Sequence, residues 1–288
     1  MQIKTILELL RQTVIRWQKD DAAWMAAALS YYTIFSLAPL ILIIFAVLGS
    51  VFEKPAIQGE LQAQIKLLIG SRAADLIGVI IKSAGRAGFG SMATVFGSLI
   101  LIFGASSIFT YLQATMNKIW RVDPGSIKAL IKTHLFRRIM SIAMIMGTGL
   151  LVILFTMAET ILAGIYHYSA QILPATIHLM IIRLVNDLVS FGLVTTLIAL
   201  IFNRLPNVHI SWRDSWIGAV FTAILITTGK VLLNLYLTNS RIVTIFGAAG
   251  SVIVVLIWFY YSAQIFYLGA EFTYVYTRYR SSSPQDQQ

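Results

Sequence analysis

Long apolar runs repeat along the whole chain, and they constrain the fold more than any other feature of the sequence. Each run supplies roughly the 20 residues that an α-helix needs to cross the hydrocarbon core of a bilayer. Backbone N–H and C=O groups find no water inside lipid, so their hydrogen bonds must close within a helix. We therefore predict an all-α integral membrane protein with a bundle of about six transmembrane helices. The runs cover residues 24–51, 91–119, 139–165, 181–202, 216–237 and 245–276.

The composition agrees with lipid as the main solvent. Hydrophobic residues make up 58% of the chain and charged residues only 12%, with a mean hydropathy of +0.79, which is too apolar for a hydrated globular surface. No soluble domain interrupts the runs, so we predict one transmembrane domain over residues 1–280 and a disordered polar tail over 281–288. The first run contains a proline and lacks a small-residue cleavage site, so we expect it to remain as a signal anchor.

Lys and Arg in the short loops predict the orientation. Basic residues gather at the N-terminus, at the C-terminus and in the loops around residues 120–138 and 203–215, whereas the opposite side has few outside the long loop 53–90. The positive-inside rule then places both termini in the cytoplasm. The net charge of +10 is explained by topology, and we expect no nucleic-acid partner. Tryptophans predicted at the cytoplasmic boundary are Trp17, Trp24, Trp120, Trp212 and Trp216.

Two segments outside the spans are amphipathic. In the N-terminal segment, apolar residues recur at helical spacing and charges lie elsewhere, the pattern of a helix that lies on the anionic lipids of the cytoplasmic face. The apolar residues are Ile3, Ile6, Leu7, Leu10, Val14 and Trp17, and the charged ones Lys4, Glu8, Arg11 and Lys19. The outer loop 53–90 repeats the pattern, so we predict that it is helical, either as a static cap or as a gate.

Ionisable side chains within transmembrane segments are costly, so each belongs to a structural pair or to a pathway. Arg183 and Asp187 are four residues apart and are expected to pair along one helix face. Glu159 and Lys230 would then be partners across helices. An ion-pair cluster that fixes helix packing and a charged cavity that faces a solute both fit this pattern.

Polar side chains form stripes along three predicted helices, spaced so that each stripe follows one helix face. They predict an internal polar seam or substrate path, although hydrogen bonding between helices would explain them equally. Tyr32 and Ser36 lie one turn apart beside Pro39, which frees a backbone carbonyl and predicts a kink. The stripe residues are Ser106, Thr110, Gln113 and Asn117, then Lys230 and Asn234, then Tyr260, Gln264, Tyr267 and Glu271.

Small residues predict where helices pack closely. Gly97 and Gly104 are seven residues apart, and Gly247 and Gly250 begin the last predicted helix. Glycine lets two helix backbones approach. We therefore assign these glycines, with Pro39, to helix packing.

Three stretches of the sequence resemble a known family. Residues Ala26–Leu40, Gly104–Trp120 and above all Phe246–Phe272 are similar to the YihY/BrkB inner-membrane family, once labelled ribonuclease BN. The resemblance covers nearly the whole chain and implies a multi-pass fold of around six helices in the bacterial cytoplasmic membrane. It implies no settled substrate.

The sequence lacks the residue groups that a nuclease active site would need. His134 and His209 fall on the predicted inner side, whereas His167 and His178 fall on the outer side, so they cannot share a catalytic metal. The sequence has no phosphate-cradling glycine loop and no nucleophile elbow. We expect no intrinsic nuclease or other enzymatic activity, no metal and no cofactor.

The sequence favours a transporter-like protein that moves a polar or lipid-linked substrate through the seam. Two other functions fit the same sequence: a non-transporting envelope scaffold and a lipid scramblase. Substrate, energy coupling, direction and protein partners stay open, and an oligomer is compatible with the sequence.

Overall fold

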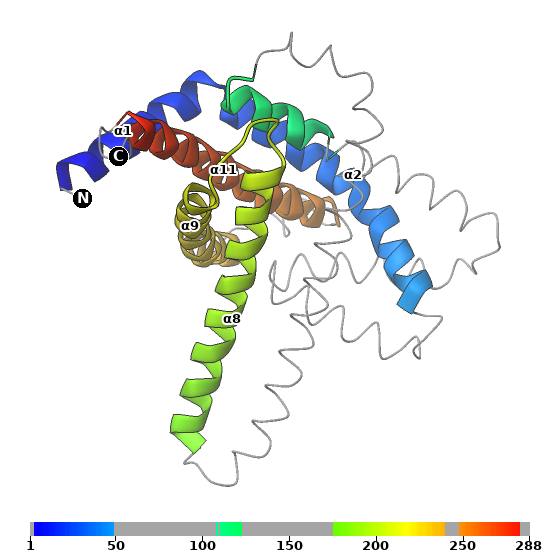
Figure 1. Cartoon of the computed structure of the whole chain (residues 1–288). Helices are drawn as coiled ribbons and strands as arrows, with labels where there is room; N and C mark the ends of the chain where they lie inside the picture. The colour runs from blue at the N-terminus through cyan, green and yellow to red at the C-terminus, as the bar shows by residue number, and fades with distance from the viewer. Residues whose placement is uncertain (1–2, 49–107, 109, 123–174, 240–247, 283–288) are drawn as a thin grey trace. The chain divides into compact units, whose positions relative to one another are not determined.

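The computed structural model describes residues 3–48, 108, 110–122, 175–239 and 248–282, and these residues form helices and turns with no strand among them (Figure 1). The labelled helices are α1 (Ile3–Lys19), α2 (Ala22–Leu48), α8 (Ala175–Arg204), α9 (Trp212–Asn239) and α11 (Ala248–Ser281). Residues 110–119 form a further helical segment. The prediction of an all-α protein is confirmed over this part of the chain.

Three of these helices are long and apolar enough to cross a membrane. The candidate spans are Asp187–Arg204, Trp212–Leu233 and Val252–Ser281, and Ala22–Phe35 is a shorter apolar helix. They coincide with four of the predicted spans, and residues 110–119 are the end of another. The predicted span 139–165 and the predicted helical loop 53–90 lie outside the described residues. The count of six therefore stays a prediction.

Two turns are made by non-glycine residues in the left-handed conformation. Asp21, between α1 and α2, has φ 57°, and Arg121, after the segment 110–119, has φ 56°. At the second turn the Val122 N–H donates to the Asn117 carbonyl at 3.0 Å, and the Arg121 N–H to the Lys118 carbonyl at 3.1 Å. This is a Schellman motif, which satisfies carbonyls that a helix end leaves open.

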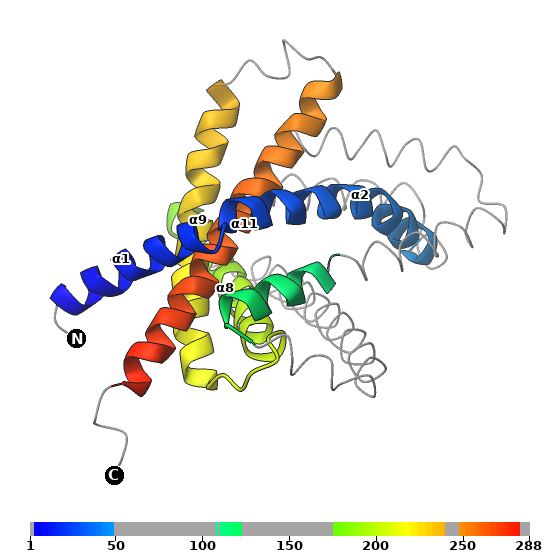
Figure 2. The same ribbon diagram turned by 90° about the horizontal axis from the view of Figure 1, so that it is seen from above.

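The described chain divides into two compact units. Unit 1 holds residues Met1–Thr115 and Leu225–Glu271, and unit 2 holds Met116–Ile224 and Phe272–Gln288. Thus α1 and α2 belong to unit 1 and α8 to unit 2. The helix α9 is divided after Ile224 and α11 after Glu271, so each contributes one part to each unit. Figure 2 shows α9 and α11 as continuous ribbons.

In unit 1 the second half of α9 packs closely against α11. A Cβ added at Gly229 would lie 2.8 Å from Ile265 Cδ1 and 2.8 Å from Tyr261 Cε1. Four residues further on, Leu233 and Val254 form an apolar cluster with Ile257, Trp258 and Tyr261. The absence of a side chain at Gly229 therefore sets the separation of the two helices.

In unit 2 the first half of α9 meets the end of α11 at another glycine. A Cβ added at Gly218 would overlap Thr273 Oγ1 and lie 2.8 Å from Thr273 Cβ. One turn further on, the Phe221 and Phe272 rings stack at 4.1 Å. Both contacts are direct, so this part of the helix pair is tightly packed.

Candidate functional site

The polar stripe on α11 becomes more buried along the helix. Tyr260 and Gln264 are half-buried, whereas Tyr267 and Glu271 are both 0% exposed. These four residues follow the 3.6-residue repeat, so they share one face of α11. A phenol and a carboxyl group are thus enclosed one turn apart within the candidate span Val252–Ser281.

The Tyr267 hydroxyl meets the segment 110–119 at Thr115. The two side-chain oxygens are 3.0 Å apart, and Thr115 Oγ1 also lies 3.1 Å from the Tyr111 carbonyl and 2.9 Å from the Leu112 carbonyl. A hydroxyl has one proton to donate. Thr115 can give this proton to a backbone carbonyl or to Tyr267, and either hydroxyl can be the donor in the contact between them.

Aromatic side chains continue this cluster toward α2. The Tyr32 and Tyr111 rings are 5.3 Å apart at 46°, and Tyr111 stands one turn before Thr115. Tyr32 itself is 39% exposed, and its part in a substrate path stays a prediction. The side chains of Ser36 and Pro39 lie outside the described residues, although the backbone of α2 is helical through both positions.

The helix α1 also contacts the part of α11 that carries the polar stripe. Trp17 Nε1 donates to the Gln264 backbone carbonyl at 3.3 Å. Tyr32, Tyr111, Thr115, Gln264, Tyr267 and Glu271 all belong to unit 1. We call these six residues the seam.

The segment 110–119 contributes different residues from those that the stripe predicted. Thr110 is exposed and Gln113 half-buried, whereas Tyr111 and Thr115 make the seam contacts. At about 100° per residue, Tyr111 and Thr115 lie on another face of the helix from Thr110 and Gln113. The sequence analysis did not single out Tyr111 and Thr115, and a part for Thr110 and Gln113 in a substrate path stays a prediction.

Asn117, the last residue of that predicted stripe, belongs to unit 2. It is 8% exposed, and its Oδ1 accepts a hydrogen bond from the Asn207 N–H at 2.9 Å. Asn117 therefore satisfies a backbone donor in the connection after α8. Its role there is to hold a turn.

The predicted charges are distributed differently from the seam. Asp187 and Lys230 are exposed, whereas Glu271 is fully buried. Leu184 (60%) and Leu188 (61%) are exposed as well, so no described helix covers the part of α8 around Asp187.

Several predicted residues lie outside the described part of the chain. These are the side chains of Arg183 and Asn234, and all of Glu159, Ser106, Gly97, Gly104 and Gly247. Gly250 is buried in unit 1.

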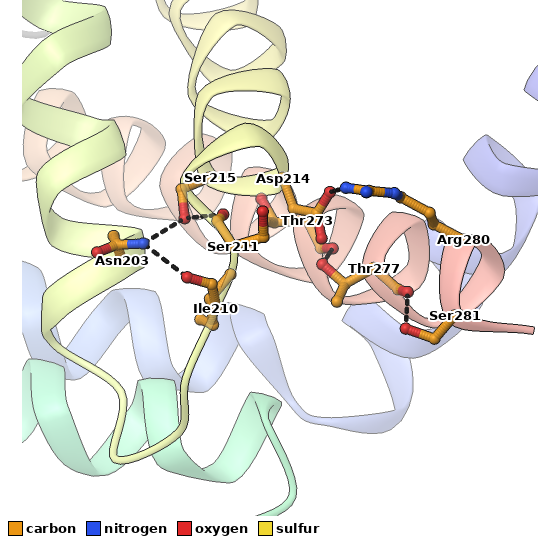
Figure 3. Close-up of polar contacts among 9 residues, drawn as sticks. All are labelled: Asn203, Ile210, Ser211, Asp214, Ser215, Thr273, Thr277, Arg280 and Ser281. Carbon is orange, nitrogen blue, oxygen red and sulfur yellow. Dashed lines mark hydrogen bonds and ion pairs between the residues drawn. The ribbon is translucent and has the colours of Figure 1, made fainter. Parts of the chain in front are cut away.

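Unit 2 holds a second polar cluster, where α8 ends and α9 begins (Figure 3). Asn203 Nδ2 donates to the Ile210 carbonyl at 2.8 Å and to Ser215 Oγ at 3.3 Å. Asp214, in the first turn of α9, pairs with Arg280 of α11 at 3.0 Å. We call Asn203, Asp214, Ser215 and Arg280 the clamp.

Trp120 is the most buried of the tryptophans that the sequence predicts at the cytoplasmic boundary. Trp24 (78%), Trp212 (46%) and Trp216 (41%) are exposed at the beginnings of helices, but Trp120 is only 7% exposed. Its ring lies 5.3 Å from the Tyr274 ring, and Arg278 lies 5.4 Å above Tyr274. The turn at Arg121 redirects the chain directly after Trp120, and the indole packs within unit 2. Its depth in the membrane stays a prediction.

Sequence reasoning missed Gly218, Gly229 and Asp214. The two glycines are three helical turns apart on α9, a spacing that would have indicated a packing face. The role of Asp214 was missed because its partner Arg280 is distant in sequence. Among the described residues, no group of three His, Cys, Asp or Glu side chains is placed to hold a metal ion.

Comparison with known proteins places the chain in a family. The family model described as Virulence factor BrkB matches residues 13–288. The chain therefore belongs to this family and is a membrane protein, which confirms the resemblance in the sequence. No solved structure matches it.

Three similar proteins are each named UPF0761 membrane protein. The relative from Alcanivorax borkumensis is 26% identical over 93% of this chain and 59% of its own length. The relative from Verminephrobacter eiseniae is 27% identical over 94% and 61%, and that from Pseudomonas aeruginosa 26% identical over 92% and 61%. This chain thus spans about three fifths of the length of these curated relatives. Their names state a membrane location and no enzymatic activity.

Proposed function

We propose that this member of the BrkB family is a transporter-like protein that moves a polar or lipid-linked substrate along the seam in unit 1. The observation that carries the proposal is the enclosure of Tyr267 and Glu271, both 0% exposed, in a helix apolar enough to cross a membrane. Ionisable groups in such helices are expensive and usually belong to a pathway for ions or solutes.

The seam residues have different roles in the proposed pathway. Glu271 supplies a carboxyl group to a cationic or hydrogen-bonding part of the substrate. Tyr267 and Thr115, joined at 3.0 Å, form a polar contact between α11 and the segment 110–119 that must separate for a substrate to pass. Tyr32 and Tyr111, in ring contact at 5.3 Å, offer amphipathic faces that suit a substrate with both polar and apolar parts.

The location and topology that we propose for the protein follow from its sequence. We infer a multi-pass protein of the bacterial inner membrane, with about six spans and both termini in the cytoplasm. The support is the distribution of Lys and Arg in the loops and the exposure of Trp24, Trp212 and Trp216 at helix beginnings, where aromatic rings prefer the headgroup level.

The test is whether the seam opens to water from both sides of the membrane. The chain has no cysteine, so a single Thr115→Cys variant reports only on the seam. Val254→Cys is the matched control, because Thr115 and Val254 are 5% and 1% exposed but Val254 lies in the apolar cluster. Both variants are reconstituted in vesicles of each orientation and treated with a membrane-impermeant thiol reagent.

The proposal predicts that Thr115→Cys is modified from both sides and Val254→Cys from neither. If Thr115→Cys is modified from neither side, the seam is static packing and a scaffold is the better account. Modification from one side only would also contradict transport. A scramblase would show both-sided labelling together with transbilayer movement of a fluorescent phospholipid in the same vesicles.

A further inference from the structure

The helix α1 presents three distinct faces, and only one of them is packed. Leu9 and Thr13 are 4% and 1% exposed, and Asp20, just after the helix, is 3% exposed. With about 100° between successive residues, these three residues fall on one side of the helix axis. The packed face also includes Trp17, whose indole bonds to the Gln264 carbonyl. One side of α1 is therefore held by packing within unit 1.

The second face is apolar and exposed. Leu7 and Val14 are 62% and 46% exposed, and their spacing of seven residues places them together on the side next to the packed face. Ile6, 43% exposed, lies about 100° from Leu7, at the edge where this face meets the packed one. A contiguous exposed apolar face marks a surface that something covers. None of these side chains belongs to the seam.

The third face is polar and opposite the apolar one. Glu8, Gln12 and Lys19 are exposed there, and Gln12 Nε2 donates to Glu8 Oε1 at 2.8 Å. Lys4 and Arg11 are also exposed and lie along the border between the polar and apolar faces. The ion pair of Arg11 with Glu8, at 3.6 Å with both side chains more than half exposed, is too weak to keep Arg11 from another anion.

These faces match a membrane surface containing anionic lipids. We propose that α1 lies in the headgroup plane of an anionic monolayer, with Ile6, Leu7 and Val14 among the upper acyl carbons and Lys4 and Arg11 on lipid phosphates. The helix has the basic residues Lys4, Arg11, Arg16 and Lys19 against the single acid Glu8, which complements a negative monolayer. The interaction is separate from the seam and goes beyond the proposed function.

The exposed aromatics of α2 agree with this placement. Trp24, Tyr31 and Phe35 are 78%, 57% and 64% exposed, and their spacing of seven and four residues puts them on one stripe of α2. Trp24 follows the α1–α2 turn directly. An indole at this position suits the boundary between headgroups and hydrocarbon, and Phe35 suits the hydrocarbon below.

The neighbouring residues Val14 and Ile15 provide the test. Both are β-branched and exposed, at 46% and 37%, but they differ by about 100° around the helix, so Ile15 falls on the water side. Single-cysteine variants Val14→Cys and Ile15→Cys of the full chain are spin-labelled and reconstituted in vesicles containing phosphatidylglycerol. Collision rates with oxygen, which partitions into lipid, and with a water-soluble nickel chelate are then compared.

The proposal predicts that the Val14 label collides preferentially with oxygen and the Ile15 label with the nickel chelate. Equal, water-like collision rates at both positions would overturn it. Shielding of the Val14 label from both reagents would also overturn it, because protein, such as a second copy of the chain, would then cover the face.

Lipid composition, substitution of the basic residues and salt together test whether anionic lipid occupies this surface. In phosphatidylcholine vesicles, the difference between the two labels should shrink, and the double substitution Lys4→Gln and Arg11→Gln should reduce it in phosphatidylglycerol vesicles. High salt should act in the same direction because it screens surface charge. If the difference is unchanged by lipid, substitution and salt, then anionic lipid is not the occupant.

Discussion

The seam in unit 1 and the clamp in unit 2 both bury polar side chains, and they use them in different ways. The clamp bonds to the backbone at helix ends and pairs opposite charges, as with Asn203 to the Ile210 carbonyl and Asp214 to Arg280. The seam places a phenol and a carboxyl group along the inside face of an apolar helix. Polar residues at helix ends satisfy groups that the fold leaves open, whereas polar residues within a span add a cost that function must justify.

The side chains that meet the two glycines of α9 also differ in how easily they can move. Beside the clamp, Gly218 meets Thr273 at its Cβ, an atom held close to the backbone of α11. In unit 1, Gly229 meets the far ends of Ile265 and Tyr261, which rotate more easily. Unit 2 should therefore tolerate less displacement between α9 and α11 than unit 1.

The largest predicted effect is on the packing at Gly218. Gly218→Ala should lower the free energy of unfolding by about 3 kcal/mol, at the upper end of the range for overpacking, because Thr273 Cβ cannot move without α11. Gly229→Ala should cost about 1 kcal/mol, since side-chain ends give way. Tryptophan fluorescence during unfolding in detergent micelles measures both changes.

Gly192→Ala is the matched control on α8. A Cβ at this exposed helical position would meet no atom of the described residues within 4 Å, so alanine should stabilise the helix by up to about 1 kcal/mol. If Gly218→Ala is as harmless as Gly192→Ala, then the tight contact in unit 2 does not exist in solution.

The next effect concerns the Asp214–Arg280 pair of the clamp. A double-mutant cycle with Asp214→Asn and Arg280→Gln should give a coupling free energy of about 2 kcal/mol, because the Asp214 side chain is only 5% exposed and its hydrogen bond is charge-assisted. The same cycle on Glu8 and Arg11, an exposed pair at 3.6 Å, should give less than about 0.5 kcal/mol. Equal coupling in the two cycles would show that burial gives the clamp no advantage.

A small effect on stability is expected at the seam itself. Tyr267→Phe removes one partner of the hydrogen bond with Thr115, and should cost about 1 kcal/mol, because Thr115 keeps its bond to a backbone carbonyl. The same substitution should increase the rate at which a water-soluble carbodiimide modifies Glu271, since it removes a contact that closes the seam. A slower or unchanged rate would mean that this hydrogen bond does not control access.

The comparison also shows which parts of the molecule the sequence could predict. Helix positions followed from apolar runs, so that the predicted span 216–237 lies within α9 and the amphipathic pattern coincides with α1. The stripe on α11 was found because its four residues keep a strict helical spacing. Local periodicity is sufficient for such features, since it depends on one helix at a time.

Features that depend on two helices were harder to predict. The contacts of Thr115 and Tyr111 with α11 and α2 were not predicted, because the neighbour of a helix determines which of its faces is buried. The pairing of Asp214 with Arg280 and the burial of Trp120 have the same origin. Each requires knowledge of which segments approach each other, and a single sequence gives no measure of that.

One measurement on the unsubstituted chain compares the two regions directly. Glu271 and Asp214 are both buried carboxyl groups, one in the seam and one in the clamp. A water-soluble carbodiimide with a glycine ester modifies the carboxyl groups that it reaches, and mass spectrometry of the protein in vesicles quantifies each site. The exposed Glu8 shows that the reagent has acted. The account predicts that Glu271 is modified and Asp214 is not, because the seam opens and the clamp stays closed. An unmodified Glu271 under conditions that fully modify Glu8 would contradict it.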